Sequence, residues 1–111
     1  MFNKIILVFA CVFFSNNLSA QSADIGWRKV LGVTCYSTVD TCVAHMAGNA
    51  FGSSSCSGTD IGFGTDTQAG KNTLALFTTA YATNKSVQVY ISGCFTRNPD
   101  KSSLIFVKIA G

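Results

Sequence analysis

Residues 68–92 read QAGKNTLALFTTAYATNKSVQVYIS, and a change of hydrophobic period inside this stretch decides the fold. The first part predicts an amphipathic helix over residues 68–83, because its larger apolar residues recur every three or four positions. These residues are Leu74, Phe77, Ala80 and Tyr81. Strict alternation of apolar and polar residues follows over residues 86–92, which indicates a half-buried strand. One helix therefore leads directly into one strand.

Short strands surround this unit on both sides. Runs rich in β-favouring residues predict a hairpin from residues 27–36 and 42–46, a third strand at 60–64 and a last strand at 104–109. The stretch 48–59 is rich in glycine and serine and predicts a loop. The order is thus three strands, one helix and two strands, without an internal repeat.

This order of elements is typical of an OB-fold, a small five-stranded Greek-key barrel. The helix between strands three and four would close one end of the barrel with Leu74, Phe77 and Tyr81. An open α+β meander with one helix on its face is the alternative. In either case the chain is mainly β with a single helix.

Residues 1–20 have the pattern of a secretory signal peptide. Lys4 precedes an apolar run from Ile5 to Phe14, which is too short to span a bilayer, and a polar segment leads to Ala20. Cleavage there would leave a single domain, residues 21–111, secreted or periplasmic and without stable membrane insertion. The expected mature chain starts at Gln21.

Removal of this segment lowers the cysteine count from five to four, since Cys11 is lost with it. An even number in an exported domain predicts a disulfide framework, with three pairings to choose from. The favoured pairing joins Cys35 to Cys42 across a hairpin and Cys56 to Cys94 between a central loop and a late strand. A four-cysteine zinc site is the alternative, but the chain has no Cys-x-x-Cys pair, so no metal is expected.

The formal net charge of +3 is small, and the basic residues are scattered along the chain. Nucleic-acid binding is not expected, because it calls for basic residues gathered on one face. Catalysis and cofactors are not expected either. His45 is the single histidine and lies within an apolar strand, while Asp60 and Asp66 suit capping and turn positions.

The segment from Asn72 to Ile91, a helix that ends in a polar turn and feeds an alternating strand, resembles the B subunit of subtilase cytotoxin and related bacterial toxin B subunits. It is also similar to small exported bacterial proteins in which Gly-Cys follows that strand, as Gly93-Cys94 does here. The resemblance covers about half of residues 21–111. It implies an OB-fold, assembly as a homopentamer, an exported enzymatic partner subunit, and binding of host-cell glycans or glycoproteins.

The function expected is that of a secreted binding module, with the glycan-binding B subunit of a toxin as its specific form. In an OB-fold the loops between strands one and two and between strands four and five frame the usual ligand face. The ligand-binding candidates in these two loops are Tyr36, Ser37, Thr38, Arg97 and Asn98. The alternative function is a small secreted structural or inhibitory protein that binds another protein.

Overall fold

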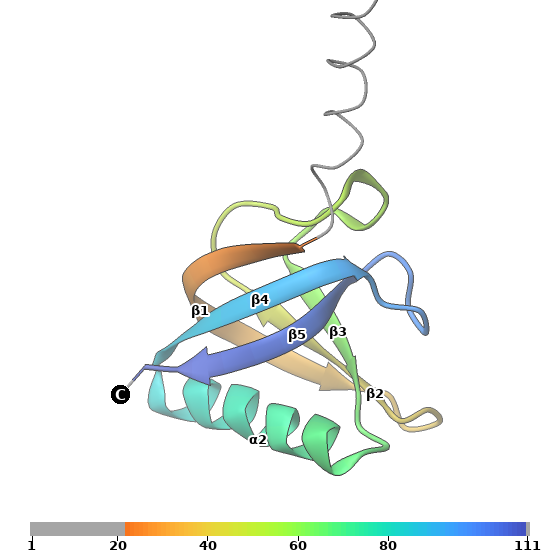
Figure 1. Cartoon of the computed structure of the whole chain (residues 1–111). Coiled ribbons are helices and arrows are strands. Elements are labelled where there is room, and N and C mark those ends of the chain that lie inside the picture. Colours follow the sequence, from red (N-terminus) through yellow and green to blue (C-terminus); the bar gives the residue numbers. More distant parts are fainter. Residues whose placement is uncertain (1–21, 111) are drawn as a thin grey trace, which may run out of the picture.

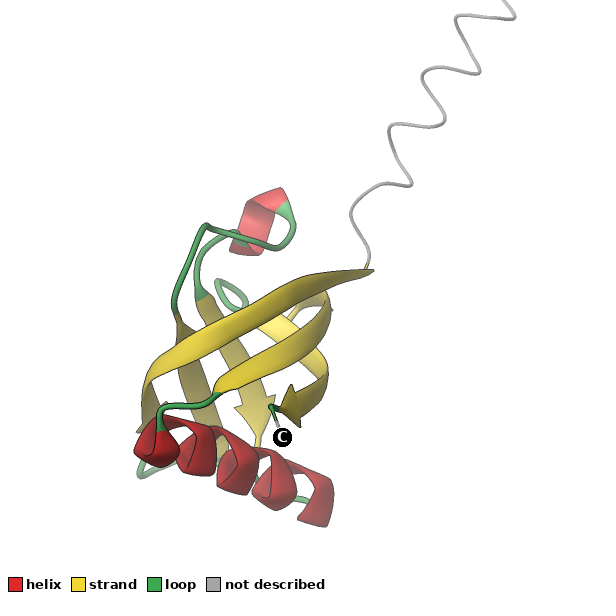
Figure 2. Ribbon diagram, turned by 90° about the vertical axis from the view of Figure 1, so that its left-hand side faces the viewer, coloured by secondary structure: helices red, strands yellow, loops and turns green. Residues whose placement is uncertain are grey.

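A computed structural model describes residues 22–110 of the 111-residue chain. The proposed signal peptide, residues 1–20, lies outside the described part. The elements, in chain order, are β1 (Ser22–Cys35), β2 (Thr41–Met46), the short 3-10 helix η1 (Ser54–Cys56), β3 (Asp60–Gly64), α2 (Gln68–Thr83), β4 (Ser86–Cys94) and β5 (Ser102–Ile109). Figure 1 shows α2 lying across one end of the strands, while the loop that carries η1 lies at the opposite end (Figures 1 and 2).

The five strands close into a barrel in the order β1-β2-β3-β5-β4, and β4 returns to pair with β1. All neighbours are antiparallel except β3 and β5, which meet in parallel through Ile61 with Ser102 and Gly62 with Ser103. The structure thereby confirms the mainly-β, OB-fold-like barrel with one helix between the third and fourth strands. A barrel leaves fewer unpaired strand edges than an open meander does.

Local sequence sets both ends of α2. The side chain of Thr67 accepts a hydrogen bond from the backbone N–H of Gly70, at 3.0 Å. Asn84 ends the helix with its backbone in the left-handed region, at φ of 55°. Its backbone N–H donates to the carbonyl oxygens of Ala80 and Tyr81. The first turn of α2 also packs closely against the end of β3, since a Cβ on Gly70 would lie 1.9 Å from the carbonyl oxygen of Gly64.

The core fills the barrel between the strands and the inner side of α2. Phe77 is fully buried, and its ring stacks on Phe63 with centroids 5.4 Å apart. Further core members from the strands are Val30, Met46, Ile61, Val87, Val89 and Ile91. Leu74 packs against this cluster, as the helical stripe predicted, and so do Val107 and Ile109 of β5.

Two details of the packing differ from the sequence expectation. Tyr81 is 56% exposed and does not help to close the barrel, so that prediction is wrong. In β5 a bulge follows Leu104, because Ile91 pairs with Leu104 and Tyr90 pairs with Phe106. The bulge turns Leu104 toward the core and leaves Ile105 54% exposed, whereas regular alternation along the predicted strand 104–109 would place Ile105 on the same side as Val107 and Ile109.

Both predicted disulfides are present. Cys35–Cys42 joins directly paired residues of the β1–β2 hairpin, with a sequence separation of 7. Cys56–Cys94 ties η1 to the end of β4, with a sequence separation of 38. All four cysteines of residues 22–110 are used in these bonds, which removes the zinc alternative. The two disulfides fit an oxidising compartment, such as the periplasm or the extracellular space.

Candidate functional site

The β1–β2 loop (residues 36–40) and the β4–β5 loop (residues 95–101) lie on the same side of the barrel (Figure 1). Arg97 Nη1 donates a hydrogen bond to the carbonyl oxygen of Asp40, at 2.7 Å. Asn98 Nδ2 donates to the hydroxyl oxygen of Tyr36, at 3.4 Å. The structure therefore brings together the two loops, and with them Tyr36, Arg97 and Asn98, that sequence reasoning singled out. Ser37 and Thr38 lie exposed between Tyr36 and Asp40.

Glycines in β3 allow the β4–β5 loop to lie flat on the barrel. A Cβ on Gly62 would come within 2.7 Å of the Phe95 ring, and a Cβ on Gly64 would come within 2.8 Å of the Arg97 guanidinium. Val43, the β2 partner of Gly62, is 1% exposed although strand alternation directs it away from the core. The loop thus forms a small second cluster on the outer surface of the barrel.

The Arg97 side chain links the β4–β5 loop to two other segments of the chain. Its Nη2 lies 2.9 Å from both carboxylate oxygens of Asp66, in the turn before α2, while Nη1 holds Asp40. The hydrogen bond from Arg97 lowers the pKa of Asp66 below its ordinary value. The guanidinium therefore has a structural role in holding both loops, whether or not a ligand also reaches it.

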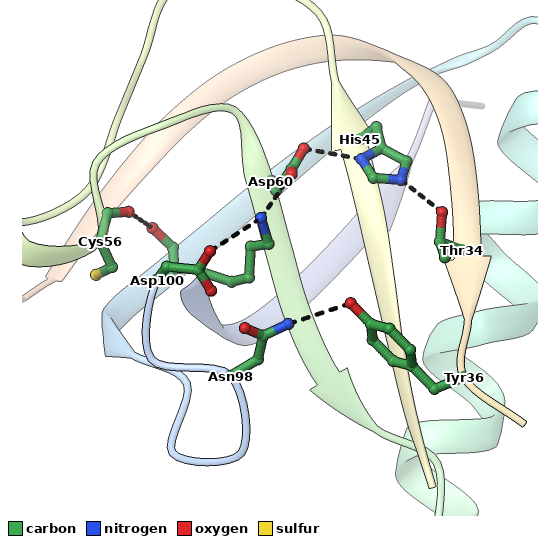
Figure 3. A network of polar contacts seen from close by, with 9 residues as sticks. Thr34, Tyr36, His45, Cys56, Asp60, Asn98 and Asp100 are labelled. Carbon is green, nitrogen blue, oxygen red and sulfur yellow. Dashed lines mark hydrogen bonds and ion pairs between the residues drawn. The ribbon is translucent and has the colours of Figure 1, made fainter. Parts of the chain in front are cut away.

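A chain of polar contacts crosses the neighbouring outer surface of β1, β2 and β3 (Figure 3). His45 lies in its centre, with Nδ1 2.8 Å from Asp60 Oδ1 and Nε2 2.8 Å from Thr34 Oγ1. Lys101, from the end of the β4–β5 loop, places its ammonium 3.1 Å from Asp60 Oδ2. This chain joins three strands and the second loop.

The donor and acceptor roles in this chain of polar contacts follow from the charge on the Asp60 carboxylate. Partial burial on its own would raise the pKa of Asp60, but the hydrogen bonds from His45 and Lys101 outweigh this, and the pKa lies below its ordinary value. An ionised carboxylate can only accept, so His45 donates its Nδ1–H to Asp60. In the neutral imidazole Nε2 is then an acceptor, and the Thr34 hydroxyl donates to it.

We define the loop face as the outer surface formed by Thr34, Tyr36, His45, Asp60, Asn98 and Lys101. The sequence pointed to Tyr36 and Asn98 as ligand-binding residues but not to the other four. Strand alternation could have placed His45 opposite the core, because Ala44 and Met46 point inward. The register that sets Asp60 beside His45 and Thr34 beside the imidazole depends on strand pairing and has no local signal.

A second surface is rich in aromatic side chains. On the outer side of β1, β4 and β5, Tyr90 stacks on Phe106 with centroids 5.5 Å apart. Trp27, which is 50% exposed, pairs with Gln88, two residues before Tyr90 on β4. The Lys108 ammonium lies 5.8 Å from the centroid of the Trp27 ring. We call the surface formed by Trp27, Tyr90 and Phe106 the aromatic face.

No family model, curated protein or solved structure matches this chain. Within residues 22–110, no helix is long and apolar enough to cross a membrane. The same residues contain no group of three or more histidine, cysteine, aspartate or glutamate side chains placed to hold a metal ion. The loop face and the aromatic face are therefore the candidate binding sites.

Proposed function

We propose that this protein is an exported binding module that holds a glycan on the loop face. The observation that carries the proposal is the contact between Tyr36 and Asn98, which joins the two loops beside a row of polar side chains. Tyr36 is 45% exposed, so part of its surface is open to a ligand. A sugar needs a flat apolar surface together with several hydrogen-bonding groups, and the loop face offers both.

The polar groups of the loop face can act as donors and as acceptors. The Asn98 amide carries a carbonyl oxygen and a second N–H in addition to the N–H that it gives to Tyr36. The Thr34 hydroxyl oxygen keeps lone pairs free while its hydrogen is given to His45. Sugar hydroxyls, which donate and accept, match such a mixed surface better than an anion or a cation would.

The anchoring of the loops supports binding. Arg97 fixes both loops to the barrel, Phe95 lies on Gly62, and Lys101 ties the end of the second loop to Asp60. A surface that is ordered before the ligand arrives loses little conformational freedom on binding. The resemblance to toxin B subunits supports a finer proposal, a homopentamer that carries an exported enzymatic subunit and uses the loop face on host-cell glycans.

Glycan-array binding of residues 21–111 tests the function, with Tyr36→Ala as the decisive variant. We expect the wild type to bind, and Tyr36→Ala to lose about 1–2 kcal/mol of binding free energy with the ring and its hydroxyl. Tyr81→Ala is the matched control, because Tyr81 is exposed to a similar degree but lies on α2. Equal binding by the folded Tyr36→Ala variant would reject the site. A wild type that binds no glycan would reject the ligand class.

The aromatic face favours a second candidate function, the binding of another protein. Trp27 and Phe106 are 50% and 48% exposed, and Tyr90 is partly exposed. Aromatic side chains on a surface are typical of protein interfaces and their energetic hot spots. Trp27→Ala should abolish capture of such a partner while leaving any glycan binding intact. The reverse pattern, with binding lost only in Tyr36→Ala, would favour the loop face.

A further inference from the structure

The structure brings a hydroxyl, an imidazole and a carboxylate into one line on the exposed surface of the barrel. Thr34 Oγ1 lies 2.8 Å from His45 Nε2, and His45 Nδ1 lies 2.8 Å from Asp60 Oδ1 (Figure 3). From this geometry we propose that Thr34 is an activated nucleophile that takes the acyl group from carboxylic esters, with His45 as its general base. This activity goes beyond the proposed glycan binding, which requires no chemistry.

The hydrogen bond to Asp60 selects the tautomer of the neutral imidazole that the role requires. A base must accept the hydroxyl proton, and the Nδ1–H bond to Asp60 leaves Nε2 of the neutral imidazole free to do so. Asp60 also orients the ring and would stabilise the imidazolium that forms. Lys101, 3.1 Å from the other carboxylate oxygen, positions Asp60 in turn.

The nucleophile is accessible and its base is partly open. Thr34 is exposed, and the side chain of His45 is 37% exposed. An ester could therefore reach the hydroxyl from solvent without any movement of the strands. Because the surface is open and not a deep pocket, the substrate class is an ester displayed on a larger molecule or a small activated ester.

The reaction balances with water as the only co-reactant. Thr34 Oγ1 bonds to the ester carbonyl carbon while its proton passes to His45 Nε2, and this proton then goes to the alcohol oxygen as the C–O bond of the ester breaks. The products of this step are an acyl-threonine and a free alcohol. A water molecule, deprotonated by His45 Nε2, next attacks the acyl carbon. The bond from this carbon to Thr34 Oγ1 breaks, the proton on His45 passes to Oγ1, and the carboxylic acid leaves.

The test is hydrolysis of p-nitrophenyl acetate by the folded chain of residues 21–111, followed through release of p-nitrophenolate. Peptide mass mapping of the same samples locates any acetyl adduct. We expect catalysed release and an adduct on the peptide that holds Thr34. Thr34→Val and His45→Gln should each lower the catalysed rate by about 100-fold, the lower end of what general-base catalysis contributes.

Two further variants separate chemistry from structure. Thr34→Ser keeps a hydroxyl at the same place and should retain both the activity and an acetyl adduct on residue 34, whereas a hydroxyl that only hydrogen-bonds His45 would carry no adduct. Thr78→Val is the matched control, since Thr78 is exposed on α2 and far from His45 in the sequence. Its rate should equal that of the wild type.

Three results would overturn the proposal. The first is a wild type that releases p-nitrophenolate no faster than buffer. The second is loss of activity in His45→Gln but not in Thr34→Val, which would make the imidazole itself the nucleophile. The third is an acetyl group found only on lysine side chains, which would indicate nonspecific acetylation. Thermal melts of every variant show whether a lost rate reflects unfolding.

Discussion

The ring of Phe95 lies on Gly62 so closely that a Cβ at position 62 would come within 2.7 Å of Phe95 Cδ2. This contact explains why β3 carries a glycine where a strand would favour a larger residue. The glycine leaves room for the β4–β5 loop to lie on β3, beside Val43, which pairs with Gly62 and is 1% exposed. The absence of a side chain at position 62 therefore determines where the β4–β5 loop lies.

Gly62→Ala should displace Phe95 and destabilise the protein. The added methyl meets the Cβ, Cγ and Cδ2 atoms of Phe95, which cannot all move aside freely, so we expect a loss of about 1–3 kcal/mol in the free energy of unfolding. Gly58→Ala is the control, because a Cβ there meets nothing within 4 Å. Urea unfolding of the two variants measures the difference. Equal stability would show that the loop does not rest on β3.

Phe77→Ala should remove the centre of the core. Phe77 is fully buried and stacks on Phe63, so we expect the free energy of unfolding to fall by about 3–5 kcal/mol. Tyr81, one turn further along the same helix, is 56% exposed, and Tyr81→Ala should change stability by less than about 0.5 kcal/mol. A large loss in both variants would place Tyr81 in a contact that the structure does not show.

The two disulfides should contribute unequally to stability. A cross-link stabilises mainly by restricting the unfolded chain, and the sequence separations are 38 for Cys56–Cys94 and 7 for Cys35–Cys42. On loop length alone, loss of the longer-range bond should cost about 1.5 kcal/mol more. Thermal or urea melts of the two double cysteine-to-alanine variants measure this. The opposite order would mean that native-state packing around the hairpin outweighs chain entropy.

The Asp60–Lys101 pair should stabilise the protein only between acid and alkaline limits. The pKa of Asp60 is lowered from 3.8, so its contribution is complete above that value and is lost as the pH falls through the folded-state pKa. The pKa of Lys101 is raised from 10.5, chiefly by its hydrogen bond to Asp60, so its contribution is complete below that value and is lost as the pH rises through the folded-state pKa.

Comparison of the wild type with Asp60→Asn in urea checks this pH dependence. The difference in unfolding free energy should be constant across the neutral range and should shrink below about pH 3.8, where the unfolded carboxyl becomes protonated. Asp100→Asn is a suitable control, since Asp100 is 71% exposed and contacts the same lysine at 3.5 Å. A difference that grows on acidification would contradict the ion-pair interpretation.

Much of the fold was predictable because its signals are local. The helix over Gln68–Thr83 has a periodic apolar stripe, a capping threonine and a terminal asparagine, and its bounds agree with the sequence prediction. The disulfide pairing followed from the even count of cysteines and the short spacing of Cys35 and Cys42. The helix signals and the spacing of Cys35 and Cys42 each lie within a short stretch of the chain, and Cys56–Cys94 is the pair that remains.

The remaining features depend on contacts between strands. The bulge at Ile105 shifts the alternation of β5, and no turn residue in the sequence marks it. The line of Thr34, His45 and Asp60 arises because β2 pairs with β1 on one side and with β3 on the other. The convergence of the two loops was predicted from the barrel topology, but the role of Arg97 as a link between segments required the position of Asp66.

Each candidate loop begins immediately after a disulfide-bonded residue: Cys35 precedes Tyr36, and Cys94 precedes Phe95. A newly synthesised chain already has every side chain of the loop face, but its two loops are not yet tethered at their first residues. Full order of the loop face is therefore expected to arise with thiol oxidation and not with translation. The protein would then be able to bind its ligand only after its disulfides have formed in an oxidising compartment.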